Sequence, residues 1–330
     1  MTFPCAARRR AEISAGLIDT LHREYGIDKP AKPVDLGGSY NLNLLLRGSL
    51  VARVYHGWMT ARRLEALQRI RRYLNELGIP TAPMKTTLDG HGWCTFNGRL
   101  IEVEHFVSAT ETMDSQERLV AGISMLAKLH DTLRVTPFGP AAATTPIANH
   151  LPPASARDWA QRGLRIFDGC PLTGDESHYV AVVQQLADEL HDAEAPFRRL
   201  PQQLVHGDFW DNNVHFRDGE IVLIGDFDFV GLRARIDDLA LTLFYANSEL
   251  DRPDALRELA DAYDAALQMQ LSSVERVALP YAIARSPLAF IAHLALMEPN
   301  EARVELAQRG PQCARALAAV HQRTWLRAFC

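Results

Sequence analysis

The chain lacks an apolar run of ~18 residues, a C-x-x-C pair and any excess of positive charge. Without such an apolar run no membrane-spanning helix is expected, and the N-terminal stretch lacks the hydrophobic segment of a secretion signal. The sequence therefore predicts a cytoplasmic protein with no membrane partner. The five cysteines are odd in number and scattered, which predicts reduced thiols and neither a disulfide framework nor a zinc site.

The net charge of −5 argues against sequence-independent binding of nucleic acid, which needs a basic surface. The charge is uneven along the chain. Residues 1–106 carry 15 Lys and Arg against 10 Asp and Glu, a balance of +5, and residues 107–330 carry 20 against 30, a balance of −10. This asymmetry predicts that the first part holds an anion and the second a cation.

A length of 330 residues with 47% hydrophobic and 23% charged residues predicts a globular protein of two lobes. Apolar spacing and turn signals predict a small antiparallel β lobe with one inserted helix, followed by a mainly helical lobe. The predicted fold class is α+β, with lobes at 1–106 and 107–330. The expected helices are 8–25, 60–77 and one ending near residue 130, a loop spans 135–153, and the expected strands are 43–46, 50–55, 85–88, 93–96 and 99–106, with a turn at Arg47-Gly48-Ser49.

The strongest chemical signal is HGDFWDNNVHF at 206–216, followed by a turn at 218–219 and the strand-like IVLIGDFDFVG at 221–231. Asn213 follows Asp208 by five residues, and Asp226 follows Asn213 by thirteen. Phosphoryl transfer needs a carboxylate that orients the attacking hydroxyl and oxygen ligands that hold Mg²⁺ against the phosphates. The spacing therefore predicts Asp208 as the catalytic base, with Asn213 and Asp226 as the magnesium ligands.

Two other classes of protein compete with this interpretation. A metal-dependent phosphoesterase would use His206, Asp208, His215 and Asp226, but a two-metal site needs more imidazole and carboxylate ligands than this segment offers. A nucleotide-binding pseudokinase would keep the fold without turnover, and the intact base and both metal ligands argue against it.

The chain resembles the aminoglycoside phosphotransferase and choline kinase family, which has a bilobal protein kinase-like fold. HGDFWDNN is similar to that family's H-x-D-x-x-x-x-N loop, and GDFD at 225–228 to its metal motif I-D-F-D, with glycine in place of isoleucine. DDLA at 237–240 and LAKLH at 126–130 resemble two further motifs in the same order. The resemblance implies a magnesium-dependent kinase, with Asp208, Asn213 and Asp226 in the roles given above.

The resemblance also implies a nucleotide site in the first lobe, for ATP or alternatively GTP. GGSYN at 37–41 would cover the phosphates, although the protein kinase motif G-x-G-x-x-G is absent. Arg53 stands where protein kinases have the phosphate-gripping lysine, with Glu65 as its expected ion-pair partner and Glu76 as the alternative. Residues 104–106 would form the hinge beside the base. The predicted nucleotide-binding residues are Gly37, Gly38, Ser39, Asn41, Arg53, Glu65, Glu104 and Phe106.

The sequence leaves the phosphate acceptor open. The acidic second lobe favours a cationic, amine-bearing acceptor such as an aminoglycoside or another amino antibiotic. GGSYNLN with LVARVY is similar to the homoserine kinase members of the family, so a metabolite kinase of the homoserine or choline type is the alternative. The candidate acceptor-binding residues are Trp210, Asp211, Asp228, Asp158, Glu249 and Asp251.

Overall fold

The structure is a computed structural model that describes residues 10–28, 33–46, 49–136, 139–144, 149–246 and 252–329. It divides into two compact units, and each is described separately. The first unit comprises residues 1–111, 136–146 and 215–225, and the second comprises 112–135, 147–214 and 226–330. The lobe boundary predicted from the sequence lies after residue 106. In the structure the first unit runs to residue 111 and also includes residues 136–146 and 215–225.

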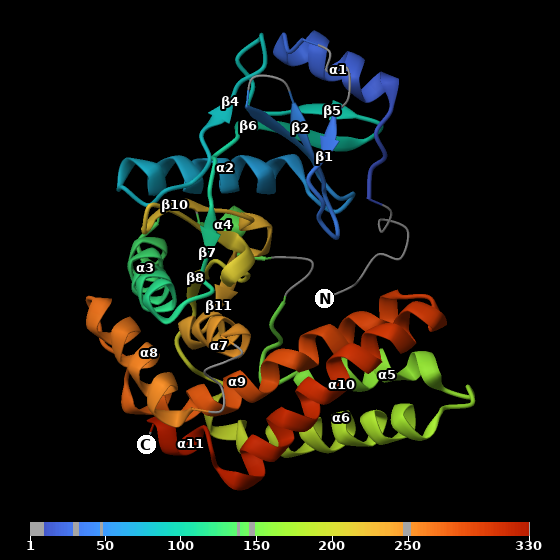
Figure 1. Cartoon of the computed structure of the whole chain (residues 1–330), viewed down its shortest axis with the longest axis vertical. Coiled ribbons are helices and arrows are strands. Elements are labelled where there is room, and N and C mark those ends of the chain that lie inside the picture. The colour runs from blue at the N-terminus through green and yellow to red at the C-terminus, as the bar shows by residue number, and fades with distance from the viewer. Residues whose placement is uncertain are drawn as a thin grey trace. The chain divides into compact units, whose positions relative to one another are not determined.

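The first unit is built on a six-stranded antiparallel sheet in the order β1-β2-β3-β6-β4, with β5 also paired to β6 (Figure 1). Alternation along Leu42–Leu46 buries every second side chain in the hydrophobic core and makes this segment a strand. The N-terminal antiparallel sheet is thereby confirmed. Its strands are β1 (Val34–Asp35), β2 (Leu42–Leu46), β3 (Leu50–Val54), β4 (Met84–Lys85), β5 (Cys94–Phe96) and β6 (Arg99–His105).

Two helices pack in this unit. Helix α1 (Ala15–Tyr25) begins at the N-cap Ser14 and buries Leu17, Leu21 and Tyr25 in the sheet's core. Helix α2 (Ala61–Glu76) begins at Thr60, whose side chain accepts a hydrogen bond from Arg63 N, and a glycine with φ +76 follows its C-terminal end. The short helix α4 (Gly139–Ala142) packs on α2.

The hairpin after the candidate catalytic loop consists of β9 (Val214–Arg217) and β10 (Glu220–Ile224). Its turn residues Asp218 and Gly219 both have positive φ, +54 and +81, as a tight two-residue hairpin turn requires. Together with β7 (Glu111–Thr112) these strands form a three-stranded sheet in the order β10-β9-β7. The hairpin places residues 213 and 226 at neighbouring strand ends.

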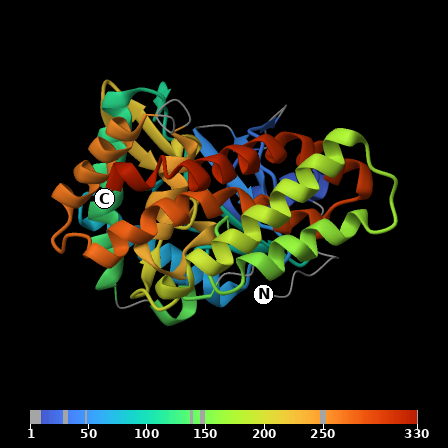
Figure 2. The ribbon, with the colours of Figure 1, turned by 90° about the horizontal axis from the view of Figure 1, so that it is seen from below.

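The second unit is mainly helical, as predicted. Its helices α5 (Ala156–Leu164), α6 (Gly174–Ala193), α9 (Ser273–His293) and α10 (Pro299–Gln322) pack together, and Figure 2 shows the orange and red C-terminal helices alongside the yellow-green ones. The helices are α3 (Gln116–Arg134), α5 (Ala156–Leu164), α6 (Gly174–Ala193), α7 (Arg235–Tyr245), α8 (Pro253–Ala266), α9 (Ser273–His293), α10 (Pro299–Gln322) and α11 (Leu326–Phe329), with two short strands β8 (Gln203–Val205) and β11 (Gly231–Arg233).

One segment of the described chain, Ser273–Leu296, is long and apolar enough to cross a membrane by length and composition alone. The most apolar 18-residue stretch of this segment has a mean hydropathy of 1.3, and 83% of that stretch is buried inside the molecule. It also carries Arg285, which is fully buried among polar partners. These features are those of a core helix, because a core helix buries its apolar side chains against other helices.

Candidate active site

The loop at residues 206–213 is held from the side by helix α7. The backbone amides of His206 and Gly207 each donate a 2.8 Å hydrogen bond to the carboxylate of Asp238. One turn further along the helix, Thr242 Oγ1 donates to Phe209 O at 2.6 Å. The second aspartate of the DDLA motif, Asp238, therefore fixes the backbone immediately before Asp208.

Close packing fixes the same loop from within. Gly207 has φ +82, and a Cβ on it would lie 2.3 Å from Phe229 O, so only glycine fits. The ring of His206 is fully buried, lies against Phe227 at 4.6 Å between centroids, and takes a hydrogen bond of 3.3 Å from Asp208 N. His206 thus acts on the loop's conformation through packing and hydrogen bonding.

Each carboxylate oxygen of Asp208 accepts a hydrogen bond from a side-chain amide. Asn213 Nδ2 donates to Oδ2 at 2.8 Å and also to the backbone oxygen of Asp208 at 2.8 Å. Asn149 Nδ2 donates to Oδ1. Asn149 was missed by the sequence analysis because it stands 59 residues before Asp208 in a loop without periodic pattern. Only the tertiary structure brings the two together.

The pKa of Asp208 is raised well above its usual value, first by burial and second by the nearby carboxylate of Asp226. The amides of Asn149 and Asn213 act in the opposite direction, because they stabilise the charged form. Asp208 is 7% exposed. Two carboxyl groups therefore lie near each other in a desolvated position, where a divalent cation would stabilise their charged forms.

The donor set fits a magnesium ion. Asn213 uses its amide nitrogen on Asp208, so its carbonyl oxygen is left for a metal, and Asp226 supplies a carboxylate close to Asp208. Asp226 has φ +55 and ψ +63, a left-handed conformation that Asp and Asn tolerate better than other side chains. Within the described residues no group of three or more His, Cys, Asp or Glu is arranged as a metal site, and this pair of one Asp and one Asn is of a different kind.

A buried arginine holds the segment that carries Asn149. Arg285 Nε donates to Leu151 O at 2.7 Å, and its Nη2 lies 2.9 Å from His150 Nε2 and 2.7 Å from Asp237 Oδ1. Its Nη1 also forms an ion pair with Glu194. Arg285 thereby ties residues 150–151 to the start of α7, the helix that also supports the 206–213 loop.

We expect Asn149→Ala to lower kcat about tenfold or more while changing the KM for nucleotide little, because a hydrogen bond to a charged group is worth about 1.5–3 kcal/mol. Asn149→Asp should lose more, since it sets a second carboxylate against Asp208. Steady-state kinetics of both variants provide the test, with the exposed Asn300→Ala on α10 as the control. A kcat for Asn149→Ala equal to that of the parent would show that Asp208 needs no such support.

In the first unit, the segment predicted to cover the phosphates is a loop between β1 and β2. Gly37 and Gly38 have φ +90 and +116, so both glycines are required by the backbone. Gly38 and Ser39 are exposed, and within the described residues their backbone amides make no hydrogen bond. Asn41 is buried, and its Oδ1 accepts from His56 N at 3.0 Å, so it shapes the loop.

The structure does not form the predicted ion pair between Arg53 and Glu65. Arg53 lies opposite Glu102 in the β3–β6 register, and the charges of Glu102 and Glu104 both interact with it. Glu65 is exposed, because it follows the buried Leu64 and each residue turns the helix by about 100°. Glu65 and the alternative partner Glu76 instead line an open pocket of about 1040 Å³ on α2.

Arg71 on helix α2 forms ion pairs with Glu102 and Glu104 on strand β6. Arg71 Nη2 lies 2.5 Å from Glu102, and its Nη1 lies 3.0 Å from Glu104. Tyr55 Oη and Gln68 Nε2 also donate to Glu102, at 2.5 and 2.9 Å. The prediction placed the cation, Arg53, on a strand and the carboxylate, Glu65, on the helix. In this observed ion pair the carboxylates lie on strand β6 and the cation, Arg71, lies on helix α2.

The predicted hinge residues lie at the end of β6 and just beyond it. The side chain of Glu104 is engaged with Arg71, and its pKa is raised, first by burial, against the opposing effects of Arg53 and Arg71. Phe106 N donates to Ser49 O at 2.7 Å, while the side chain of Phe106 remains 42% exposed. The ring of Phe106 is thus free to pack on another group.

The candidate acceptor-binding residues differ in their surroundings. Trp210 is half-buried beside Tyr245, with ring centroids 4.5 Å apart, and Asp211 lies next to it with a pKa raised by burial. Asp228 is buried in the turn after Asp226. Asp158 is exposed in the first turn of α5, near Arg157. Glu249 and Asp251 lie outside the described residues.

A sequence model of the phosphotransferase enzyme family matches residues 32–272, which is most of the chain. The chain belongs to this family. The match includes the glycine loop, the 206–213 loop and the start of α7. No curated protein sequence matches this phosphotransferase family member significantly.

Solved structures share the fold of this phosphotransferase family member. A microcompartment-associated aminopropanol kinase is 16% identical with a TM-score of 0.73, covering 94% of this chain and 98% of that one. An amicoumacin kinase in complex with AMP-PNP, Ca²⁺ and Ami is 14% identical with a TM-score of 0.66, covering 91% and 92%. A choline/ethanolamine kinase family protein from Mesorhizobium loti is 15% identical with a TM-score of 0.64, covering 95% and 96%.

Proposed function

We propose that this protein is a magnesium-dependent kinase that transfers the terminal phosphoryl group of ATP to a hydroxyl of an amine-bearing small molecule. The observation that carries the proposal is the environment of Asp208. Its carboxylate is buried, both of its oxygens accept amides, and a second carboxylate, Asp226, lies near enough to raise its pKa. A base held in one orientation beside a metal-ligating carboxylate is what phosphoryl transfer requires.

In the proposed reaction the acceptor hydroxyl attacks the terminal phosphorus, the bond to the bridging oxygen of ATP breaks, and ADP leaves. Asp208 orients the hydroxyl and receives its proton. Asn213 and Asp226 would hold Mg²⁺, which supplies positive charge against the phosphate oxygens. The free amides of Gly38 and Ser39 would bind phosphate oxygens, and Arg53 would add positive charge.

Two lines of support favour an amine-bearing acceptor. Residues 107–330 carry a balance of −10, which favours a cationic ligand. Two structures of the same fold are an aminopropanol kinase and a choline/ethanolamine kinase family protein, and aminopropanol, choline and ethanolamine each bear an amine or a quaternary ammonium group. Within this class we propose an aminoglycoside or another amino antibiotic, with phosphorylation as the means of resistance. The alternative is a metabolite kinase of the homoserine or choline type.

The test is coupled ADP release across a panel of amino alcohols, amino sugars and amino antibiotics, with ATP and GTP compared as donors. We expect an amine-bearing acceptor to be used at least about tenfold more efficiently than its N-acetylated analogue, and more so at low salt, because screening weakens attraction to an acidic site. Equal efficiency with both acceptors at two salt concentrations would contradict the cationic assignment.

The same assay addresses the pseudokinase alternative. Binding of nucleotide without ADP release for any acceptor would favour a binding module. We further propose that the protein acts in the cytoplasm, where ATP and magnesium are supplied, and that its partners are the nucleotide and the acceptor, with no nucleic acid or membrane. Cell fractionation with an antibody to the protein tests this location.

A further inference from the structure

The glycine loop at residues 36–41 is weakly held by its own strand. Strand β1 has only two residues, Val34 and Asp35, and both are exposed. It pairs at the sheet's edge through Val34 with Leu45 and Asp35 with Leu44. So short an exposed strand buries little apolar surface, and the loop that follows it needs other contacts to keep one conformation.

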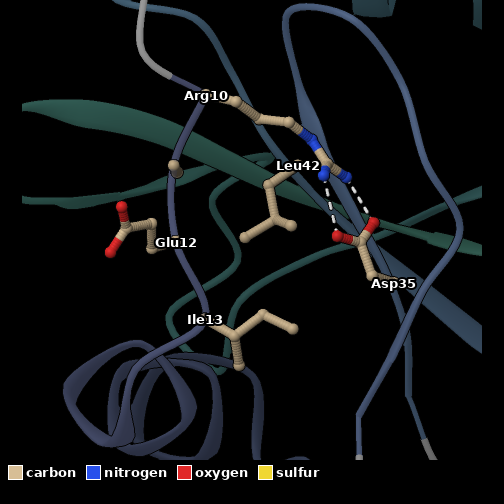
Figure 3. Close-up of a pocket in the computed structure, with 6 residues that line it drawn as sticks. Arg10, Glu12, Ile13, Asp35 and Leu42 are labelled. Atoms are coloured by element: carbon tan, nitrogen blue, oxygen red, sulfur yellow. Dashed lines mark hydrogen bonds and ion pairs between the residues drawn. The ribbon is translucent and has the colours of Figure 1, made fainter.

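Those contacts come from Arg10, which lies in the segment before α1 (Figure 3). Its guanidinium forms a two-pronged ion pair with Asp35, with Nη1 donating to Oδ2 at 2.7 Å and Nη2 donating to Oδ1. Nη2 also donates to Gly37 O at 3.0 Å, and Nε donates to Asn41 O at 2.8 Å. All three nitrogens of one side chain are therefore bound to the loop and its strand.

Two further hydrogen bonds within the loop and its flanking strands involve the same groups, the carboxylate of Asp35 and the backbone oxygen of Gly37. Gly37 N donates to Asp35 Oδ1 at 2.8 Å, and Asn43 Nδ2 donates to Gly37 O at 3.0 Å. The hydrogen bonds from Arg10 and then from Gly37 N lower the pKa of Asp35, as expected for a carboxylate held in its charged form. These bonds leave the exposed amides of Gly38 and Ser39 without a partner among the described residues, available to an anion.

Arg10 itself is attached to a fixed element. Helix α1 starts five residues later and is anchored by Leu17, Leu21 and Tyr25, and Tyr25 Oη donates to Ile101 O at 3.0 Å. Both Arg10 and α1 precede the residues matched by the family model, which begin at 32. The brace therefore lies outside the part of the chain that the family model matches.

We infer that Arg10 is a positioning residue that braces the 36–41 loop in the conformation that receives nucleotide phosphates. The inference rests on the proposed function. Arginine is needed at this position because its planar fork can bond to Asp35 and to two backbone oxygens at once, and lysine cannot. The ion pair is partly exposed, at 27% and 37% for the two side chains, so its geometry matters more than its charge.

Hydrogen exchange of the full-length protein, measured without nucleotide, tests the brace itself. Arg10→Ala should speed amide exchange about tenfold in peptides covering residues 36–41 and leave peptides of β2 and β3 unchanged. Asp35→Ala should do the same, and the double variant should add little, because the two side chains form one unit. Glu12→Gln is the matched control, since Glu12 lines the same pocket without bonding to the loop.

Calorimetric titration with AMP-PNP and magnesium tests the link to nucleotide. We expect Arg10→Ala to weaken binding about tenfold, Arg10→Lys to recover only part of it, and Glu12→Gln to bind as the parent does. Unchanged exchange in Arg10→Ala overturns the inference whether or not the protein is a kinase. Faster exchange with unchanged affinity also overturns it. Absence of nucleotide binding by the parent would instead reject the proposed function.

Discussion

Asp208→Asn is expected to lower kcat by about 10²–10⁴-fold while leaving the affinity for AMP-PNP within about twofold, because general-base catalysis has that magnitude. The asparagine keeps the size of the side chain but cannot take the proton of the acceptor hydroxyl. The buried position makes the result interpretable. Removing a carboxylate that is desolvated beside Asp226 relieves like-charge repulsion, so the fold should not be lost with the chemistry.

Three measurements decide this prediction: coupled ADP release with the best acceptor of the panel, calorimetric binding of AMP-PNP, and the thermal midpoint. The control is Asp218→Asn, which removes an exposed carboxylate from the hairpin turn, where asparagine tolerates the positive φ equally well. An Asp208→Asn variant that keeps more than about a tenth of the parent's turnover would remove Asp208 from the role of base.

Asp226→Asn is expected to raise the magnesium concentration needed for half-maximal activity by about 100-fold or more, since even the outer partners of metal ligands are worth 10–100-fold in affinity. Asn213→Ala should have the smaller effect, because an amide oxygen brings no net charge to the ion. Asparagine at 226 tolerates the left-handed backbone of Asp226, so the turn after β10 should persist.

Magnesium titrations of activity and of thermal stability in the presence of AMP-PNP give two independent readings of metal binding. In the parent, magnesium with nucleotide should raise the thermal midpoint, because a ligand that binds only the folded state stabilises it. The Asp226→Asn variant should show little of this rise at the same magnesium concentration. If the activity and the thermal midpoint of Asp226→Asn level off at the same magnesium concentrations as those of the parent, Asp226 does not hold the ion.

The local part of the site was predictable from the sequence. Asp208 and Asn213 lie on one loop and Asp226 follows the hairpin β9–β10, so the position of Asp226 relative to the loop follows from turn chemistry at Asp218 and Gly219 over a short stretch of chain. The α+β architecture was predictable for a similar reason, because strand alternation and helical spacing are properties of neighbouring residues. Short strands such as β1 were missed, since two exposed residues carry no periodic signal.

The partner of Arg53 could not be predicted, because it depends on which strand lies beside β3 and on the rotation of α2. Chain order favoured Glu65 on the next helix. The sheet instead pairs β3 with β6, which brings Glu102 opposite Arg53, and the phase of α2 turns Glu65 to solvent and Arg71 inward. An error of one residue in helical phase rotates a side chain by about 100°, which is enough to exchange partners.

The sequence by itself determined which residues are the candidates for the chemistry, since Asp208, Asn213 and Asp226 stand out by residue type and by short spacing. Only the tertiary structure decided what surrounds them. Asn149 reaches Asp208 across 59 residues, and Arg10 reaches the glycine loop from outside the family-matched region. The physical reason is that such contacts depend on how whole elements pack, and long-range packing leaves no periodic trace in the sequence on either side of the contact.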